Sequence, residues 1–227
     1  MHDSLRVQGR IPLEEPYTGL GFDHIGGGGE TIEPEVLSGL GNGTVVDWVF
    51  IELRSEADPT IVVATRSALI LTNGLVVDTN GFSPVAFADL PPGSFHVALR
   101  HRNHLGVMAA SPTAIMSSQP GFVDFAQPYT MTYGVDARKY IYPNMVLWAG
   151  DVNHDGLLKY VGSDNDRDPI LVGIGGSVPT NTASGYLQED VNMDGQAKYV
   201  GERNDRDPIL VNIGGSIPTN TRQEQLP

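Results

Sequence analysis

Two short segments of the chain place oxygen-bearing side chains on alternate positions. The first reads DVNHDG and begins at Asp151, and the second reads DVNMDG and begins at Asp190. A loop that curls over such a segment turns its oxygens toward one centre, and the glycine permits the sharp turn. Hard oxygen ligands in a loop of this size favour Ca²⁺. The side chains concerned are Asp151, Asn153 and Asp155 in the first segment and Asp190, Asn192 and Asp194 in the second.

Both segments open a longer internal repeat. The copies start 39 residues apart and are identical at 25 of 32 aligned positions. Each opens like an EF-hand or dockerin loop, in which the backbone carbonyl of the seventh residue is also a ligand. Here the seventh residue is Leu157 or Gln196. The twelfth position, which supplies a bidentate carboxylate in the standard loop, holds Gly162 or Gly201, so that ligand must come from elsewhere.

The missing carboxylate is expected from the segment NDRDP, which follows in both copies. Its candidates are Asp166 and Asp168 in the first copy and Asp205 and Asp207 in the second. One aspartate of each pair also suits the cap of a short helix beginning at Pro169 in the first copy, so which one binds the ion stays open. Asn165 and Asn204 stay open as ligands too. Asp164 is a poor candidate because Arg203 replaces it in the second copy.

The repetition favours two calcium sites over two ordinary turns. A single DxNxDG segment is often only a turn rich in Asp and Asn, but here two copies stand in register and each precedes a second acidic pair. Magnesium prefers a tighter octahedron and keeps its waters, and zinc prefers nitrogen or sulfur ligands. We expect the ions to be structural staples rather than switches, because no helix precedes the first loop.

Composition excludes several kinds of partner. The chain has 227 residues, with 14 Lys and Arg against 27 Asp and Glu, and a net charge of −13. We expect no nucleic-acid partner, because phosphate contacts need Lys and Arg, and no membrane insertion, because no apolar run approaches the roughly 18 residues of a spanning helix. The absence of cysteine excludes disulfides and thiolate metal sites. Since MHDSLRVQGRIPLEEPY lacks the apolar core of a signal peptide, either the protein is cytosolic or Met1 is internal to a longer precursor.

Three regions are expected to position the loops. Residues 1–43, with GFDHIGGGGETIEP, predict an extended glycine-rich arm. Residues 44–149 contain strand-like runs such as VVDWVFIELR and TIVVATRSALILT and predict a mainly β domain, an antiparallel β-sandwich of Ig-like or transthyretin-like type. Residues 150–227 hold the calcium-loop repeats, 150–188 and 189–227, with short helices. Because each copy is too small to fold alone, Tyr160 and Tyr199 are expected at a seam between them.

The other groups of side chains in the sequence predict no catalytic site. The cluster RHRNH, from Arg100 to His104, either binds an acidic glycan or a neighbouring subunit, or is a polar strand end whose charges are solvated or paired internally. The second interpretation is favoured. A zinc site made by His101 and His104 lacks a third ligand nearby. No GxSxG, HExxH, SxxK or phosphate-binding glycine loop occurs, so we expect no enzyme.

Several phrases of the sequence resemble known extracellular modules. FADLPPGSFHVALRH resembles a strand of transthyretin-like and collagen-adhesin B-type sandwiches. LRVQGRIPLEEPYTGLGF, LWAGDVNHDG, YVGSDNDRDPIL and GGSIPTNTRQEQLP together resemble the C-terminal module of very large secreted surface proteins of Gram-negative bacteria. This second resemblance covers essentially the whole chain. It implies an extracellular or cell-surface location, with the signal peptide outside this sequence, and dockerin-like repeats at the end of the chain.

The resemblance and the loops together favour a calcium-stabilised, non-enzymatic structural or adhesive module of a bacterial surface polymer or fibre. Its expected partners are copies of itself, other cell-surface proteins or glycans. The alternative is a dockerin-like or carbohydrate-binding module that anchors a larger secreted protein. A hydrolase with a calcium-stabilised site is the least favoured interpretation, because the acidic pairs sit where calcium already explains them.

Overall fold

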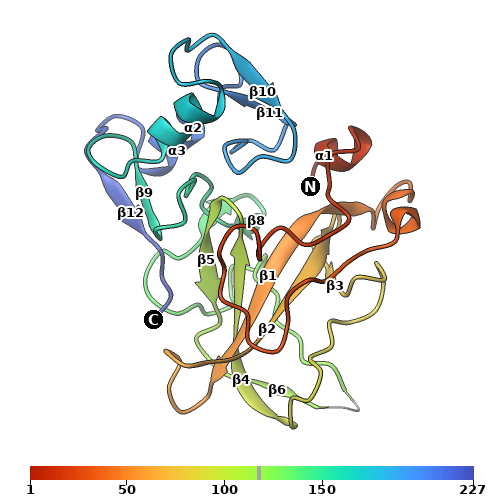
Figure 1. The fold of residues 1–227 in the computed structure, drawn as a ribbon. Helices are drawn as coiled ribbons and strands as arrows, with labels where there is room; N and C mark the ends of the chain where they lie inside the picture. The colour runs from red at the N-terminus through yellow and green to blue at the C-terminus, as the bar shows by residue number, and fades with distance from the viewer. Residues whose placement is uncertain (117–118) are drawn as a thin grey trace.

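The structure is a computed structural model, which describes residues 1–116 and 119–227. The fold is mainly β, with a few short helices, and no helix in these residues is long and apolar enough to cross a membrane (Figure 1). One antiparallel sheet has six strands, and the remaining strands form two-stranded ribbons. The six strands are β1 (Val45–Ser55), β2 (Val62–Leu71), β3 (Val76–Val77), β4 (Gly93–His101), β5 (His104–Met108) and β6 (Thr113–Ile115).

Strand β1 lies at the centre of the six-stranded sheet. The strand order is β3-β2-β1-β4-β5, and β6 pairs with the first residues of β4. All of β1 except its last residue is buried, as its apolar residues on both faces predict for a central strand. The turn from β2 to β3 uses Asn73 and Gly74, whose φ of +88° is the conformation that an Asn-Gly turn requires.

Among the described residues the six-stranded sheet is the one large sheet, and no second sheet packs on it as a sandwich requires. Residues 78–90 and 120–147, which are loops apart from one short hairpin in the second range, take its place on the face that carries Val49, Ile51 and Leu99. The side chains that pack there include Val85, Phe87, Phe125 and Leu147. The antiparallel β class is therefore confirmed, whereas the covering layer differs. Alternating apolar residues show that a face is buried, and they do not show which kind of segment buries it.

The glycine-rich arm covers the other face of the same sheet. It includes α1 (Ser4–Val7) and the 3-10 helix η1 (Pro34–Leu37). The Tyr17 hydroxyl donates to the carbonyl of Trp48 (2.9 Å), and Trp48 Nε1 donates to the carbonyl of Pro12 (3.0 Å). The chain's own sheet therefore holds the arm. The arm residues buried in this core are Leu5, Ile11, Tyr17 and Ile32.

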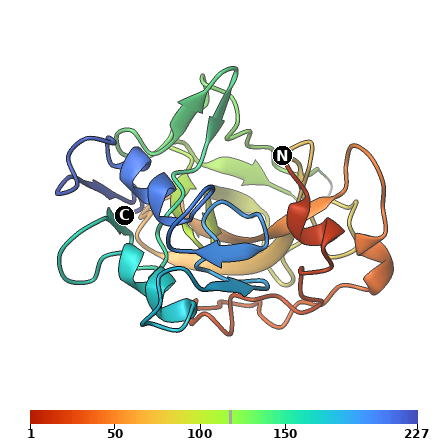
Figure 2. The ribbon, with the colours of Figure 1, turned by 90° about the horizontal axis from the view of Figure 1, so that it is seen from above.

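The two C-terminal repeats are joined by exchanged strands. Strand β9 (Leu157–Lys159) of the first repeat pairs with β12 (Thr221–Gln223) of the second. Strand β11 (Gln196–Lys198) of the second repeat pairs with β10 (Thr182–Ser184) of the first. Helices α2 (Arg167–Gly173) and α3 (Arg206–Asn212) lie between the two ribbons, and Figure 2 shows the repeats over the sheet from above. Neither repeat completes its ribbon alone. A separate hairpin consists of β7 (Lys139–Ile141) and β8 (Asn144–Val146).

A small apolar core fills the seam between the repeats. Each repeat contributes one isoleucine from its helix and one valine from its loop, and all four side chains are buried. Tyr160 and Tyr199 pack against this core, which confirms their predicted place at the seam. The four buried side chains are Val152, Ile170, Val191 and Ile209.

Candidate metal centres

The first loop, residues 151–168, folds around its own oxygen side chains. Three backbone N–H groups donate to them, from Gly156 to Asp151 Oδ2 (3.3 Å), from Asp155 to Asn153 Oδ1 (3.2 Å) and from Leu157 to Asp155 Oδ1 (2.9 Å). Gly156 has φ +76°, which glycine adopts without steric cost. One tight turn therefore holds the first, third and fifth residues, as their spacing predicted.

Asp166 closes the first loop from beyond the twelfth position. Its side chain is 0% exposed. Its Oδ1 accepts the N–H of Val152 and its Oδ2 accepts the N–H of Lys159, both at 2.8 Å. Its own N–H donates to the carbonyl of Lys159 (2.9 Å). The chain thus makes an excursion through Gly162, at φ +95°, and returns to the loop at Asp166.

Asp168 points away from the first loop. Its side chain is 59% exposed. Its carboxylate accepts Asn165 Nδ2 (2.8 Å), while its N–H donates to Asn165 Oδ1 (3.0 Å). This reciprocal pair closes the first turn of α2, which begins at Arg167 rather than at Pro169. Of the two aspartates that the sequence left open, the structure brings Asp166 into the loop and leaves Asp168 on the helix.

In the second loop, residues 190–207, one aspartate is again buried in the loop and the other is exposed at the start of the helix. Asp205 is 0% exposed and accepts the N–H groups of Asn192 (3.1 Å) and Lys198 (2.7 Å). Asp207 is 61% exposed and forms the reciprocal pair with Asn204 at 2.8 and 3.0 Å. Asn165 and Asn204, which were open as ligands, therefore cap the two helices.

The seventh residues, Leu157 and Gln196, begin strands β9 and β11. Their predicted contribution is a backbone carbonyl, so their different side chains do not matter to it. Their N–H groups donate to Asp155 Oδ1 (2.9 Å) and Asp194 Oδ1 (3.1 Å). Each seventh residue is thereby held next to the fifth residue of its loop.

Each loop buries one oxygen that no donor reaches. This oxygen is Asp151 Oδ1 in the first loop and Asn192 Oδ1 in the second. The two loops differ because the N–H of the fifth residue donates to Asn153 in the first loop and to Asp190 Oδ1 (3.0 Å) in the second. A buried acceptor without a donor costs free energy. Both loops therefore contain an oxygen whose unused lone pairs suit a cation.

Burial raises the pKa of the carboxyl groups in both loops. The pKa of Asp151 is raised to about 7, first by burial and then by the charges of Glu224 and Asp155. These carboxylates therefore need a counter-charge if they are to stay ionised at neutral pH. Burial also raises the pKa of Asp166 and Asp205 to about 7 and raises that of Asp190.

The donor chemistry of the loops fits calcium. Within residues 1–116 and 119–227, no three His, Cys, Asp or Glu side chains converge closely enough to form a ready metal-binding group. Each loop nonetheless combines carboxylate and amide oxygens from its turn with one buried carboxylate from beyond the turn. This set has no sulfur or nitrogen ligand, and it includes an oxygen with free lone pairs.

Glu224, which sequence reasoning missed, lies beside the first loop. Its N–H donates to the carbonyl of Gly156 (2.7 Å), and its Oε1 accepts the N–H of Gly106 (2.6 Å) in β5. Its charge contributes to the raised pKa of Asp151. The matching residue of the first copy is Gly185. This difference between the two copies was the sign of Glu224 that the sequence offered. It can be interpreted only once β12 is known to pair with β9.

The basic cluster joins the junction between the two repeats to the sheet. Arg102 is 1% exposed, forms an ion pair with Asp47 (3.2 Å) and donates to the carbonyl of Leu187. Asn103 Nδ2 donates to the carbonyl of Asp190 (2.8 Å). Although burial acts to raise it, the neighbouring Arg102 guanidinium holds the pKa of Asp47 at about 2. Arg102 is therefore paired inside the protein, as the internal reading of this cluster predicted.

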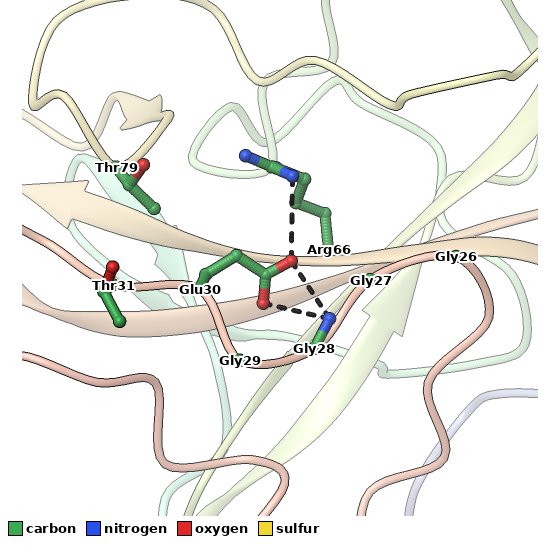
Figure 3. Close-up of a pocket in the computed structure, with 8 residues that line it drawn as sticks. All are labelled: Gly26, Gly27, Gly28, Gly29, Glu30, Thr31, Arg66 and Thr79. Carbon is green, nitrogen blue, oxygen red and sulfur yellow. Dashed lines mark hydrogen bonds and ion pairs between the residues drawn. The ribbon is translucent and has the colours of Figure 1, made fainter.

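The tetraglycine segment lines a shallow hollow over β2 (Figure 3). Glu30 Oε1 accepts the N–H of Gly28 (3.1 Å) and lies 3.7 Å from the Arg66 guanidinium. A Cβ atom at Gly27 would lie 2.5 Å from the carbonyl oxygen of Thr65, so glycine is required there. The segment is a packed turn whose charges are paired internally. The hollow, of about 430 Å³, is lined by residues 26–31, Arg66 and Thr79.

No protein-family model, curated protein or solved structure matches the chain.

Proposed function

We propose that residues 150–227 bind two Ca²⁺ ions, one in each loop, and that the chain is a non-enzymatic extracellular module with a structural or adhesive role. The observation that supports this most is the buried oxygen without a donor, Asp151 Oδ1 in the first loop and Asn192 Oδ1 in the second. Each of these oxygens shares its loop with buried carboxylates, and burying such charge is unfavourable without a partner.

Five residues of each loop would hold the ion. The exposed aspartates Asp168 and Asp207 are left out, because both belong to helix caps. The bound ion would supply the positive charge that keeps the buried carboxylates ionised. The proposed ligands are Asp151, Asn153, Asp155, Asp166 and the carbonyl of Leu157 in the first loop, and Asp190, Asn192, Asp194, Asp205 and the carbonyl of Gln196 in the second.

A structural role follows from how the loops are connected. Each loop runs from its turn into a strand and then, through the returning aspartate, into a helix of seven residues. Because strands are exchanged between the repeats, an ion in either loop orders a ribbon that both repeats share. Extracellular modules of this loop type bind calcium with Kd values of about 10⁻⁴ to 10⁻³ M, which suits a permanent staple outside the cell.

The setting we propose is a bacterial cell-surface polymer or fibre, in which the chain contacts copies of itself, other surface proteins or glycans. The resemblance to C-terminal modules of large secreted proteins supports it. Light scattering of the pure chain with 5 mM CaCl₂ or with EGTA tests self-assembly. Oligomers in calcium support contacts between copies, and a strict monomer in both buffers opposes them.

A second candidate function is anchoring through glycans. It is favoured by tyrosines exposed around the β7–β8 hairpin, namely Tyr140 (56%) and Tyr142 (84%). Sugar rings stack on exposed aromatic faces. A glycan array probed with the full chain and with Tyr142→Ala tests it, and Phe82→Ala removes an equally exposed ring elsewhere as the control (78%). Glycan binding that is lost in Tyr142→Ala but kept in Phe82→Ala supports the glycan function.

Thermal unfolding tests the calcium proposal. The chain is heated in 5 mM CaCl₂ and, separately, in excess EGTA with MgCl₂. Ligands that bind only the folded state stabilise it by mass action, so we expect a higher Tm in calcium by several degrees. Equal Tm values in the two buffers would remove the basis of the proposal.

A further inference from the structure

The C-terminal segment 224–227 crosses from the first loop onto the sheet. It follows β12, which pairs with β9 directly after the first turn. Glu224 connects the two units, because its N–H donates to the Gly156 carbonyl (2.7 Å) and its Oε1 accepts the N–H of Gly106 in β5 (2.6 Å). Arg54 then donates to the carbonyl of Pro227 (3.0 Å). One short segment thus contacts the loop, β5 and β1.

The second carboxylate oxygen of Glu224 faces the first turn. A Cβ atom added at Gly156 would lie 3.5 Å from Glu224 Cβ and 3.7 Å from Glu224 Oε2. The N–H of Gly156 donates to Asp151 Oδ2 on the same turn. The Asp151 side chain is 3% exposed and its Oδ1 has no donor. The turn at Gly156 therefore has a buried oxygen with free lone pairs on Asp151 and an extra carboxylate, that of Glu224, beside it.

The second loop has no such carboxylate. Gly185 occupies the position that corresponds to Glu224, and its N–H donates to the Gly195 carbonyl (3.3 Å) in the same manner. Instead of a further carboxylate, two cations of the loop itself lie near its fifth residue. Lys198 Nζ lies 3.8 Å and an Arg203 guanidinium nitrogen 3.7 Å from Asp194 Oδ2. The second loop therefore has one fewer negative group and two positive groups at its fifth residue.

We propose that Glu224 is a further carboxylate ligand of the ion in the first loop, so that calcium binds there more tightly than in the second loop and fastens segment 224–227 to the sheet. This inference rests on the proposed calcium function. Calcium accepts six to eight oxygens, and the affinity of such loops rises with the number of charged ligands. In the standard loop the twelfth residue supplies two carboxylate oxygens. Here Asp166 would supply one carboxylate oxygen and Glu224 the second.

The affinity difference is tested by calcium titration of the full chain, followed by NMR at the amide signals of Gly156 and Gly195. We expect the Gly156 signal to respond at lower calcium concentration. Glu224→Gln keeps an acceptor for Gly106 and removes only the charge. It should weaken the first loop about tenfold and leave the second unchanged. Glu56→Gln removes an exposed charge outside both loops and serves as the matched control.

A reciprocal variant gives the second loop the missing group. Gly185 has an ordinary backbone, and a Cβ atom there would make only a 3.5 Å contact with Leu187. Gly185→Glu should therefore fold and should raise the calcium affinity of the second loop severalfold. Hydrogen exchange of residues 221–227 should slow on calcium addition in the natural chain, and less so in Glu224→Gln.

The outcomes separate this inference from the proposed function. Weaker binding at Gly156 in Glu224→Gln, with faster exchange of the C-terminal segment, supports the inference. Two loops that bind calcium with unchanged affinity in Glu224→Gln overturn it and leave the calcium function standing. No response at either glycine in the natural chain overturns both.

Discussion

The two loops share their internal geometry and differ in what surrounds them. Asp166 and Asp205 are both 0% exposed and each accepts two backbone N–H groups. Beside them, the first loop has the carboxylate of Glu224 from the C-terminal segment, whereas in the second loop its own Lys198 and Arg203 lie near Asp194. Repeated sequence therefore produces repeated local structure, while Glu224 and the replacement of Asp164 by Arg203 make the two sites electrostatically unequal.

The loops also differ in how they are attached to the sheet. The second loop is joined to it by Asn103, which donates to the Asp190 carbonyl, and by buried Arg102, which pairs with Asp47 and donates to the carbonyl of Leu187 just before the loop. The first loop reaches the sheet through Glu224 and through buried Leu158, which packs in one core with Leu105 of β5. Only the attachment of the first loop includes a proposed metal ligand. Removing calcium should therefore loosen the first loop more than the second.

The largest effect is expected from Asp47→Ala. It leaves Arg102 buried without its counter-charge, which should lower the free energy of unfolding by about 3–5 kcal/mol. Hydrogen exchange should then speed up more in β11 than in β9, because Arg102 donates to the carbonyl of Leu187, just before the second loop. Urea unfolding of this variant and of Asp23→Ala, an exposed aspartate, measures the difference. Equal losses in the two variants would show that the buried pair does not attach the second loop.

A second effect separates ligands from caps within each loop. Asp166→Ala should abolish calcium binding in the first loop, and Asp205→Ala should do so in the second, because each removes a buried carboxylate. The matched variants Asp168→Ala and Asp207→Ala should keep calcium binding and cost only about 1 kcal/mol as lost helix caps. Calcium titration of the four variants measures this. If only Asp168→Ala and Asp207→Ala lost calcium binding, these aspartates would be the ligands, and Asp166 and Asp205 would not.

A smaller effect concerns pH. In EGTA, burial raises the pKa of Asp151, Asp166 and Asp205 to about 7, above the ordinary value near 4. The folded state then holds more protons than the unfolded state between these values, so stability is present at low pH and is lost as pH rises toward 7. We expect the calcium-free Tm to fall from pH 5 to pH 8, and the increase in Tm caused by calcium to grow. A calcium-free Tm that rises over this range would contradict these shifts.

Local chemistry was the part of the site that sequence could predict. The turn of the first loop depends on Asp151, Asn153 and Asp155 at fixed spacing, and a gap at the twelfth position pointed to the acidic cluster beyond it. The choice of Asp166 over Asp168 could not be predicted, because it depends on the side-chain pair that Asn165 makes with Asp168.

Long-range contacts were the part that sequence could not predict. The pattern of β1 showed two buried faces, but it did not show that an arm rich in glycine would cover one and loops the other. Glu224 likewise has no counterpart in the first copy, where Gly185 stands. Its role depends on the exchange of β12 onto β9, which joins residues far apart in sequence.

Isothermal titration of the full chain with CaCl₂, after dialysis against EGTA and then against metal-free buffer, tests the central claim most directly. We predict two ions bound per chain, with the tighter site lost in Asp166→Ala and the weaker one lost in Asp205→Ala. A flat titration up to millimolar calcium, from protein that is folded by circular dichroism, would contradict the account.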